Sequence, residues 1–502
     1  MNTIQHIIGG EYMSGSTGKA QIVTQAVYNP ATGEQSAELV LGELAEVNAA
    51  VKAAQEAFPE WSATAPAKRA RLMFKLHAVM TKRSDEIAKT LSAEHGKTHD
   101  DALGEVTRAL EVVEFAAGIP THLNGNFSSN VGSNIDTHSE RQALGVVAGI
   151  TPFNFPSMVP LWMIPMALAC GNTFVLKPSE RDPSSANLIY ELLKEAGFPD
   201  GVLNIVHGGK PAVDAILDHK DIEAVSFVGS TPIAEYVYTR GCAAGKRVQA
   251  LGGAKNHMII MPDADLDQAA DALMGAGFGS AGERCMAISV AVPIGQETAD
   301  KLVEKLTPQV AAMKIGPSID PSAEMGPIIT REARDRIAGL IDIGANEGAK
   351  VVVDGRGLKL QGYENGFWIG GTLLDNVTPD MSIYKTEIFG PVLSVLRADT
   401  YKQAVNLIND HEYGNGTAIF TRDGDAARDF AARIKVGMVG INVPIPVPVA
   451  YHSFGGWKRS SFGAHGIYGP EAVHFYTRLK TVTSRWPTGI RKGAEFNFPS
   501  NG

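Results

Sequence analysis

Cys285 is the side chain of this sequence best suited to nucleophilic chemistry. It lies in the segment GSAGERCMA, where the glycines would let the backbone approach a substrate closely. A thiol reacts as its thiolate, and the positive charge of the adjacent Arg284 would lower the thiol pKa. A free cysteine is more often a small buried apolar residue, so both interpretations stay open for Cys285 taken alone. Cys170, in MALACGN, and Cys242, in GCAAG, fit the structural interpretation better.

Two segments offer groups that commonly bind nucleotides. In EAVSFVGSTPIAEYV a strand ends at Gly229 and Ser230 opens a helix, whose free N–H groups and dipole suit a phosphate. In TFVLKPSER, Lys177 stands at the end of a strand and Glu180 follows it, so the two could hold ribose hydroxyls or phosphate at the sheet edge. An empty strand–helix turn and a solvated loop are the alternatives, and neither motif decides alone.

Two further segments carry polar or aromatic side chains beside turns. Asn154 in TPFNFPSMVP could donate its amide to an oxyanion, and Glu387 and Phe389 precede a Gly-Pro turn in KTEIFGPV. Each segment could instead be structural. The pattern G-x-G-x-x-G occurs at residues 277–282, but it follows a helix and not a strand, which indicates a nucleophile loop in place of a Rossmann fingerprint.

Alternating helices and apolar strands must position these residues. The spacing of apolar residues predicts a helix at residues 44–58 and a long helical region at about 66–117. From Leu144 onward, apolar runs such as GVVAGI and NTFVLK alternate with helices, which predicts parallel sheets in an α/β fold. Gly197 is placed to end one of these helices. The segment VHFYTRLKTVTSRW, at residues 473–486, predicts a late strand.

Composition limits the class of protein. The 502 residues allow several domains, and a net charge of −9 without a basic block argues against nucleic acid as the main partner. The longest apolar run, residues 158–170, contains prolines and is shorter than the ~18 residues that cross a bilayer, so no membrane is expected. Three cysteines without a CxxC predict free thiols and no metal site. With no targeting pattern in the first twenty residues, we expect a cytoplasmic protein.

The motifs, taken in order, resemble the NAD(P)-dependent aldehyde dehydrogenases. PFNFP, LKPSE, FVGST, ALGGAKN, GERCM, EIFGPV and FGGWKRSSFG follow one another as they do in that family, across almost the whole chain. The resemblance implies an α/β fold with a parallel-sheet NAD-binding domain, an α/β catalytic domain and a β-strand oligomerisation arm that makes a dimer or tetramer. By the same resemblance the three parts are residues 1–122 with 143–253, residues 254–465, and residues 123–142 with 466–490.

The resemblance also implies roles for single residues. Cys285 would attack the aldehyde carbon, and the Asn154 amide with the Cys285 N–H would bind the oxyanion. Hydride transfer to NAD would then leave an acyl thioester on Cys285. Glu180 favours NAD over NADP, because a carboxylate binds the ribose 2′-hydroxyl and repels a 2′-phosphate. The residues that would contact NAD are Phe153, Lys177, Glu180, Arg181, Gly229, Ser230, Leu251, Glu387 and Phe389.

One departure from the family pattern predicts the acyl acceptor. Hydrolytic members carry a Glu in E-L-G-G-K that activates water, and this chain has Ala250 at that place. Water would attack the thioester slowly without a base, whereas thioesters exchange readily with another thiol, which favours coenzyme A. The segments GAKNH and GSAGERCMA are similar to the methylmalonate-semialdehyde dehydrogenase (CoA-acylating) branch.

The substrates of that branch are methylmalonate and malonate semialdehydes, which bear a carboxylate. It leaves as CO₂, giving propionyl-CoA or acetyl-CoA. Arg284 and Arg108 would be its bidentate partners, although an exposed helix charge is an equal alternative for Arg108. Three other functions stay open: a hydrolytic aldehyde dehydrogenase, a cysteine-dependent hydrolase or acyltransferase without a nucleotide, and a non-catalytic interaction protein.

Overall fold

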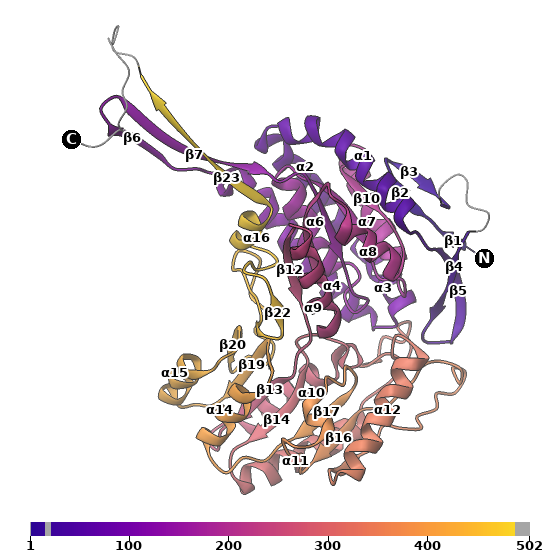
Figure 1. Ribbon diagram of the computed structural model, residues 1–502. Coiled ribbons are helices and arrows are strands. Elements are labelled where there is room, and N and C mark those ends of the chain that lie inside the picture. The colour runs from indigo at the N-terminus through magenta and orange to yellow at the C-terminus, as the bar shows by residue number, and fades with distance from the viewer. Residues whose placement is uncertain (1, 16–21, 487–502) are drawn as a thin grey trace.

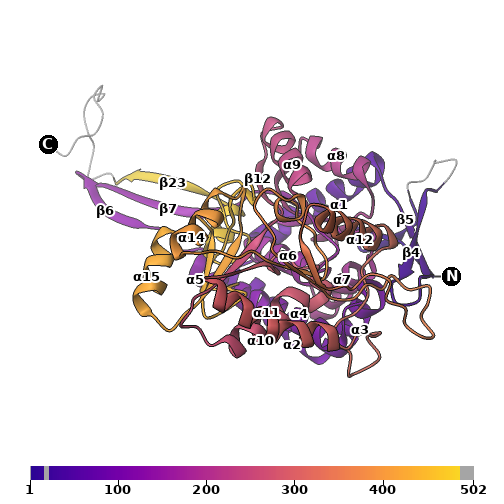
Figure 2. The ribbon, with the colours of Figure 1, turned by 90° about the horizontal axis from the view of Figure 1, so that it is seen from below.

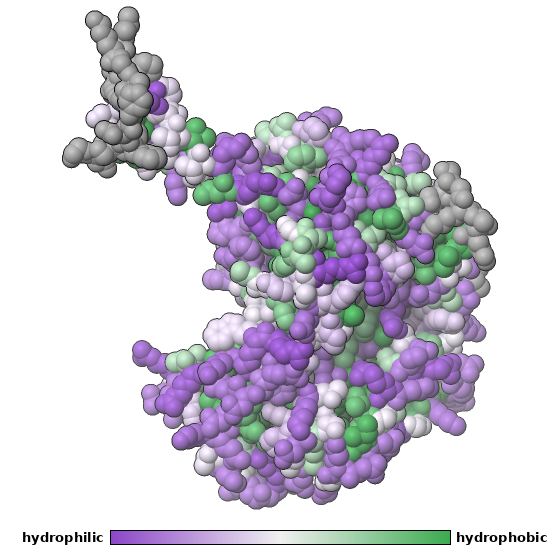
Figure 3. Space-filling view, viewed as in Figure 1, coloured by the Kyte–Doolittle hydropathy of each residue, from purple (hydrophilic) through white to green (hydrophobic). Residues whose placement is uncertain are grey.

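Two sheets with helices around them build the body of the molecule, and a narrow third sheet projects from it (Figures 1 and 2). A computed structural model describes residues 2–15 and 22–486. Within these residues no helix combines the length and the apolar character that crossing a membrane requires. The space-filling view shows a deep recess between the two parts of the body, on the side that carries the projecting sheet (Figure 3).

The first sheet has eight strands, of which the central five are parallel. Its order is β22-β12-β11-β8-β9-β10-β2-β3. The five parallel strands are buried on both faces, as the continuous apolar runs of the sequence predict. The strands are β2 (His6–Ile8), β3 (Glu11–Met13), β8 (Val146–Ile150), β9 (Thr173–Lys177), β10 (Leu203–Ile205), β11 (Ile222–Val228), β12 (Arg247–Leu251) and β22 (Ser461–Phe462).

Helices cover both faces of this sheet. Residues 158–169 of the apolar run at 158–170 form α6, which is buried on all sides and therefore needs no polar face. The helices of this part are α1 (Leu44–Ala63), α2 (Pro66–Lys82), α3 (Ser84–His95), α4 (His99–Ala117), α5 (Ile119–His122), α6 (Met158–Ala169), α7 (Ser184–Ala196), α8 (Lys210–Asp218), α9 (Thr231–Ala243) and α16 (Pro470–Phe475).

The second sheet has seven strands in the order β15-β16-β17-β14-β13-β19-β20. All its pairings are parallel except that of β15 with β16. The strands are β13 (Asn256–Ile260), β14 (Ile288–Pro293), β15 (Lys350–Val353), β16 (Thr372–Asp375), β17 (Val392–Val395), β19 (Gly416–Phe420) and β20 (Met438–Ile441). The helices are α10 (Leu266–Phe278), the 3₁₀ turn η1 (Gly279–Gly282), α11 (Gln296–Ala312), α12 (Arg331–Asn346), α13 (Ser382–Lys385), α14 (Tyr401–Asp410) and α15 (Gly424–Arg433).

The projecting sheet joins distant parts of the chain. β23 (Thr477–Arg485) pairs with β7 (Ile135–Ala143) along its whole length, and β7 pairs with β6 (Phe127–Gly132). Two small sheets complete the fold. They contain β1 (Asn2–Ile4), β5 (Glu34–Val40) and β4 (Thr24–Asn29), and the pair β18 (Tyr413–Gly414) and β21 (Trp457–Lys458).

Two sequence predictions differ from the observed elements. The long helical region predicted at 66–117 is three helices, because α3 ends at Gly96, which is left-handed with φ 90°. The predicted late strand begins only at Thr477. Its first residues form α16, where Pro470 fits the first turn and Val473 and Phe475 pack into the core, so burial outweighs their β propensity.

The capping role predicted for Gly197 is confirmed and gives a stability test. Gly197 follows α7 with φ 92°, so Gly197→Ala places a side chain in a left-handed conformation and should cost about 1 kcal/mol. Gly339 lies inside α12 with open space around its Cα, so the same change there should stabilise by about 0.5–1 kcal/mol. Thermal unfolding should show shifts of opposite sign. Shifts of the same sign would contradict the observed end of α7.

Candidate active site

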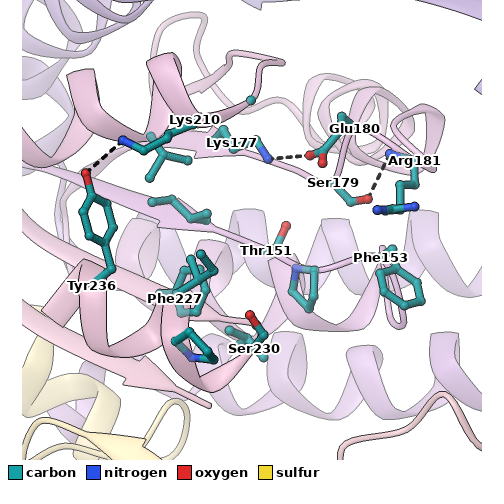
Figure 4. Close-up of a pocket in the computed structure, with 18 residues that line it drawn as sticks. Thr151, Phe153, Lys177, Ser179, Glu180, Arg181, Lys210, Phe227, Ser230 and Tyr236 are labelled. Carbon is teal, nitrogen blue, oxygen red and sulfur yellow. Dashed lines mark hydrogen bonds and ion pairs between the residues drawn. The ribbon is translucent and has the colours of Figure 1, made fainter. Parts of the chain in front are cut away.

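A pocket of about 520 Å³ lies where β8, β9 and β11 end at the sheet edge (Figure 4). Lys177 and Glu180 lie on the opposite side of the pocket from Ser230, and Lys177 Nζ is 2.9 Å from Glu180 Oε2. Burial opposes ionisation of Glu180, but the charge and hydrogen bond of Lys177, a backbone hydrogen bond and the charge of Arg181 together outweigh it, and the pKa of Glu180 is lowered. Phe153, Arg181 and Gly229 also line this pocket, so it gathers six of the residues predicted to contact a nucleotide.

The turn between β11 and α9 leaves polar groups free at the pocket wall. Ser230 is the N-cap residue of α9, and its hydroxyl makes no capping bond. A Cβ on Gly229 would lie 2.5 Å from the ring of Phe227, so this position requires glycine. The backbone therefore passes close to the pocket at a helix N-terminus, an arrangement that suits phosphate oxygens.

A second cavity, of about 410 Å³, contains Cys285. Arg284 and Arg108 both line it, which places Arg108 beside the nucleophile candidate and not on a remote helix surface. The Arg108 guanidinium donates to Glu111 Oε2 at 2.7 Å and to the Pro448 carbonyl at 2.6 Å. Two cations thus lie in the wall of the cavity that holds the thiol.

Arg284 is neutralised across the cavity wall. Its guanidinium pairs with Asp101, which α4 supplies. Gly279 packs on the guanidinium, since a Cβ there would lie 2.5 Å from Arg284 Nη1. The two cations of this wall are therefore already balanced by Asp101 and Glu111, and a bound anion would share the guanidinium groups with these carboxylates.

The nucleophile loop is held by hydrogen bonds to its backbone. Asn256 Nδ2 and Asn415 Nδ2 donate to the Cys285 carbonyl at 2.9 and 3.1 Å. Ser280 and Ala281, in η1, adopt left-handed φ values of 52°. Such strained residues persist only where the surrounding structure holds them, and they cluster at functional sites. The loop therefore has a fixed geometry at the sulfur.

Asn154 is buried on the segment that precedes α6. Lys97 Nζ donates to its backbone carbonyl at 2.8 Å. Within the described residues its side-chain amide makes no hydrogen bond, so its N–H groups are available to an incoming acceptor. Next to it, the rings of Phe153 and Phe389 meet edge to face with centroids 5.8 Å apart.

Leu251 and Glu387 line spaces that Cys285 also lines and do not line the 520 Å³ pocket. Leu251 lines the cavity of Cys285. Glu387 lines a space of about 10 Å³ with Cys285 and Phe389, and its Oε1 accepts from the Ala254 N–H at 2.9 Å. A space of this size is at the lower limit for one water. Burial raises the pKa of the Glu387 carboxyl against the opposing effects of the Ala254 N–H, Lys255 and Arg336.

Ala250 cannot act as the general base that would activate water, because its side chain is apolar and buried. It lies in β12, fully buried between Phe227 of β11 and Phe462 of β22. Two carboxylates of the described residues line the cavity with Cys285, and both are engaged: Asp101 pairs with Arg284, and Glu105 bonds to Lys97. Both carboxylates of that wall are therefore ion-paired, and Asp101 Oδ2 is buried without a hydrogen-bond partner.

The sequence profile of the aldehyde dehydrogenase family matches residues 17–482. The chain belongs to this family. A malonate-semialdehyde dehydrogenase of Pseudomonas aeruginosa is 57% identical over 501 residues, 100% of both chains. The acylating, mitochondrial methylmalonate-semialdehyde dehydrogenase of Arabidopsis thaliana is 47% identical over 492 residues, which cover 97% of this chain and 80% of that protein.

Solved structures agree. A Sinorhizobium meliloti 1021 protein crystallised with NAD is 60% identical, with a TM-score of 0.96 over 98% of this chain and 99% of that one. A methylmalonate-semialdehyde dehydrogenase of Oceanimonas doudoroffii is 57% identical, with a TM-score of 0.95 over 97% of this chain and 99% of that one. The predicted family and its α/β fold are confirmed.

Sequence analysis missed several residues of this site. Asn256 and Asn415, which hold the Cys285 carbonyl, carry no local signal that separates them from other buried amides. Asp101 and Glu105 had a signal, because they precede Arg108 by seven and three residues and so share its face of a helix. The spacing would have indicated them once Arg108 was suspected.

The Cys285 thiol is less acidic than its neighbour Arg284 suggests. Burial and the charge of Glu387 raise the pKa of Cys285 to about 11, and the opposing effect of Arg284 does not compensate. Arg284 does lower the thiol pKa, as expected, but burial and the charge of Glu387 outweigh its effect and the net pKa is raised. A bound substrate or cofactor therefore has to lower the pKa of Cys285 for the thiolate to form readily near neutral pH.

This electrostatic balance predicts the reactivity of the thiol. Iodoacetamide should alkylate Cys285 about tenfold faster per pH unit between pH 7 and 10, because the thiolate fraction rises toward a pKa of about 11. Glu387→Gln removes the negative charge, lowers the thiol pKa and should speed alkylation at pH 8 several-fold. Peptide mass mapping measures the rate. The control is Glu347→Gln, which changes an exposed carboxylate that accepts from the Ser382 N–H. Unchanged or slower alkylation in Glu387→Gln would mean that Glu387 does not raise the pKa of Cys285.

Proposed function

We propose that this enzyme oxidises malonate semialdehyde and methylmalonate semialdehyde with NAD and transfers the acyl group to coenzyme A, releasing CO₂. The observation that carries the proposal is a cavity of about 410 Å³ that holds the Cys285 thiol together with the guanidinium groups of Arg108 and Arg284. A semialdehyde acid has an electrophilic aldehyde carbon, which the thiol can attack, and a carboxylate, which the two guanidinium groups can bind. The names of the relatives support the same substrates.

The 520 Å³ pocket suits the adenosine end of NAD. Lys177 and Glu180 would hold the ribose hydroxyls, and Ser230 at the start of α9 would meet the pyrophosphate. The carboxylate of Glu180, already ionised by Lys177, disfavours a 2′-phosphate. Glu387 and Phe389, which border Cys285, would meet the nicotinamide ribose and ring. NAD, when bound, supplies the hydride acceptor.

Cys285 and Asn154 carry the chemistry of the aldehyde carbon. The Cys285 thiolate adds to the carbonyl carbon, and the oxygen that becomes an oxyanion accepts from the free Asn154 amide and the Cys285 N–H. Loss of hydride from that carbon would leave a thioester on Sγ. Arg108 and Arg284 would bind the substrate carboxylate until the C–C bond breaks and CO₂ departs, while the electron pair passes into an enolate whose oxygen Asn154 holds. A proton from solvent would then add to the α-carbon and give the acetyl or propionyl thioester.

The acyl group then leaves as a coenzyme A thioester. The thiolate of coenzyme A attacks the thioester carbon, and Cys285 Sγ is the leaving group. Two features support this acceptor over water: Ala250 replaces the base of hydrolytic members, and Asp101 and Glu105 are engaged elsewhere. A hydrolytic dehydrogenase that releases a free acid is the alternative that the assay below separates.

We further propose that residues 1–122 with 143–253 form the NAD-binding domain and 254–465 the catalytic domain. Residues 123–142 with 466–490 would form an arm in which β6, β7 and β23 project and α16 packs into the body. The arm would pair subunits into a dimer or tetramer, in the cytoplasm as the free thiols favour. Phe127, Leu479 and Trp486 expose large apolar surfaces on the projecting sheet, which supports an interface there. Residues 487–490 lie outside the described residues.

Coenzyme A dependence tests the proposed reaction. With malonate semialdehyde and NAD, NADH should form in one burst per active site without coenzyme A and continue to turn over only when it is present, because no base activates water. Acetyl-CoA should accumulate in step with NADH. Cys285→Ser should abolish both. Full turnover without coenzyme A, with a free acid as product, would contradict the acylating reaction and favour the hydrolytic one.

Substrate recognition is tested at Arg108. Arg108→Gln removes one charge-assisted contact to the substrate carboxylate, so kcat/KM for malonate semialdehyde should fall by about 10- to 100-fold. Propanal has no carboxylate, and its kcat/KM should change less than about threefold. Initial NADH formation measures both substrates with the same enzyme. An equal fall for the two would mean that Arg108 has a structural role only.

A further inference from the structure

Lys97 and Glu105 form an ion pair beside the cavity of Cys285, and the proposed reaction leaves it without a role. Their charged atoms lie 2.7 Å apart, and both side chains are 0% exposed. Removing two charges from water is costly, and replacing such a pair with apolar residues is often neutral or stabilising. Stability therefore does not explain why the pair is here.

Within the described residues, the other side-chain hydrogen bonds of the pair, and the ring contact of Lys97, are made with one short segment. Lys97 Nζ donates to the Asn154 carbonyl at 2.8 Å and lies 4.5 Å from the centroid of the Phe155 ring. Glu105 Oε1 accepts from the backbone N–H groups of Ser157 and Met158 at 2.8 and 2.9 Å. The pair thus hydrogen-bonds to both ends of residues 154–158. This segment carries the predicted oxyanion donor, Asn154.

Glu105 also replaces a cap that the segment lacks. Ser157 is the N-cap residue of α6, but its side chain makes no capping bond. The Glu105 carboxylate, from α4, satisfies two N–H groups at this helix N-terminus and complements its dipole. The start of α6, and with it the position of Asn154, is therefore set by a residue of another helix.

One face of α4 connects this segment to the nucleophile. Asp101, Glu105 and Arg108 all line the cavity, at spacings of four and three residues that bring them to the same side of the helix. Asp101 pairs with Arg284, the neighbour of Cys285. Glu105 holds residues 154–158. The helix is rigid, so the two loops keep a fixed separation.

We propose that Glu105 and Lys97 are positioning residues that hold the Asn154 amide at a fixed position relative to Cys285 during attack on the aldehyde. The inference rests on the proposed function, in which Asn154 stabilises the oxyanion. Neither Glu105 nor Lys97 touches the reacting atoms in this account. Both act through the backbone of residues 154–158.

A double-mutant cycle tests the coupling. The readout is the rate of NADH formation in the first turnover, without coenzyme A. Asn154→Ala should slow it by about 100- to 1,000-fold, as expected for loss of one oxyanion donor, and Glu105→Gln by at least about tenfold. Glu105→Gln should add no further loss in the Asn154→Ala background, because its effect passes through the missing amide. The Kd for NAD should stay the same in all variants.

Two controls separate positioning from a general loss of structure. Glu94→Gln changes another buried carboxylate, one that bonds to the Ser184 N–H and does not contact residues 154–158, and should keep the wild-type rate. The double variant Lys97→Met with Glu105→Leu replaces the pair by apolar side chains, should fold, and should still lose at least about tenfold in the first turnover.

The possible failures can be told apart. If Asn154→Ala leaves the first turnover unchanged, the oxyanion role in the proposed function is wrong and the inference falls with it. If Asn154→Ala is slow but Glu105→Gln or the folded apolar pair keeps the wild-type rate, the inference alone is overturned. Multiplicative losses in the cycle would also overturn it, since they mean that Glu105 does not act through Asn154.

Discussion

The cavity-facing side of α4 is the constraint on which the arrangement of this site depends. It supplies Asp101 to the nucleophile loop, Glu105 to the segment before α6 and Arg108 to the wall of the cavity that contains Cys285. These three partners come from regions of the chain that are far apart in sequence. A helix fixes the spacing of its own side chains more rigidly than a loop does. The side chains of α4 therefore hold the nucleophile loop and the segment before α6 at a fixed distance from each other.

Charge in the cavity is balanced before any ligand enters. Arg284 and Arg108 are paired with Asp101 and Glu111, and the thiol of Cys285 lies close to the carboxyl of Glu387. The thiol pKa of about 11 means that little thiolate exists at neutral pH in this state. In the proposed reaction, a substrate carboxylate would shift the balance at the guanidinium groups, and a cofactor contact that engages Glu387 would shift it at the sulfur. Ligand binding and formation of the thiolate would then depend on the same charges.

The proposed acyl acceptor follows from what surrounds the sulfur. Ala250 is buried within a strand and contributes nothing polar, while the carboxylates of the cavity wall are committed to Arg284 and Lys97. Glu387 and Cys285 line a common space that is about the size of one water. A thiol nucleophile carries its own reactivity once it ionises and needs no such base, which is why coenzyme A suits this site better than water does.

The sequence by itself determined the family, the α/β fold and most of the residues around the two pockets, because motifs such as PFNFP and GERCM carry their chemistry in local order. Its errors were local, as at residues 473–476, where apolar β-branched and aromatic types predict a strand but packing against the core makes α16. The tertiary structure alone decided the side of α4 that Arg108 occupies, the role of Glu105 and the pKa of Cys285. Each depends on burial and on charges brought together from distant parts of the chain, and neither quantity can be read from neighbouring residues.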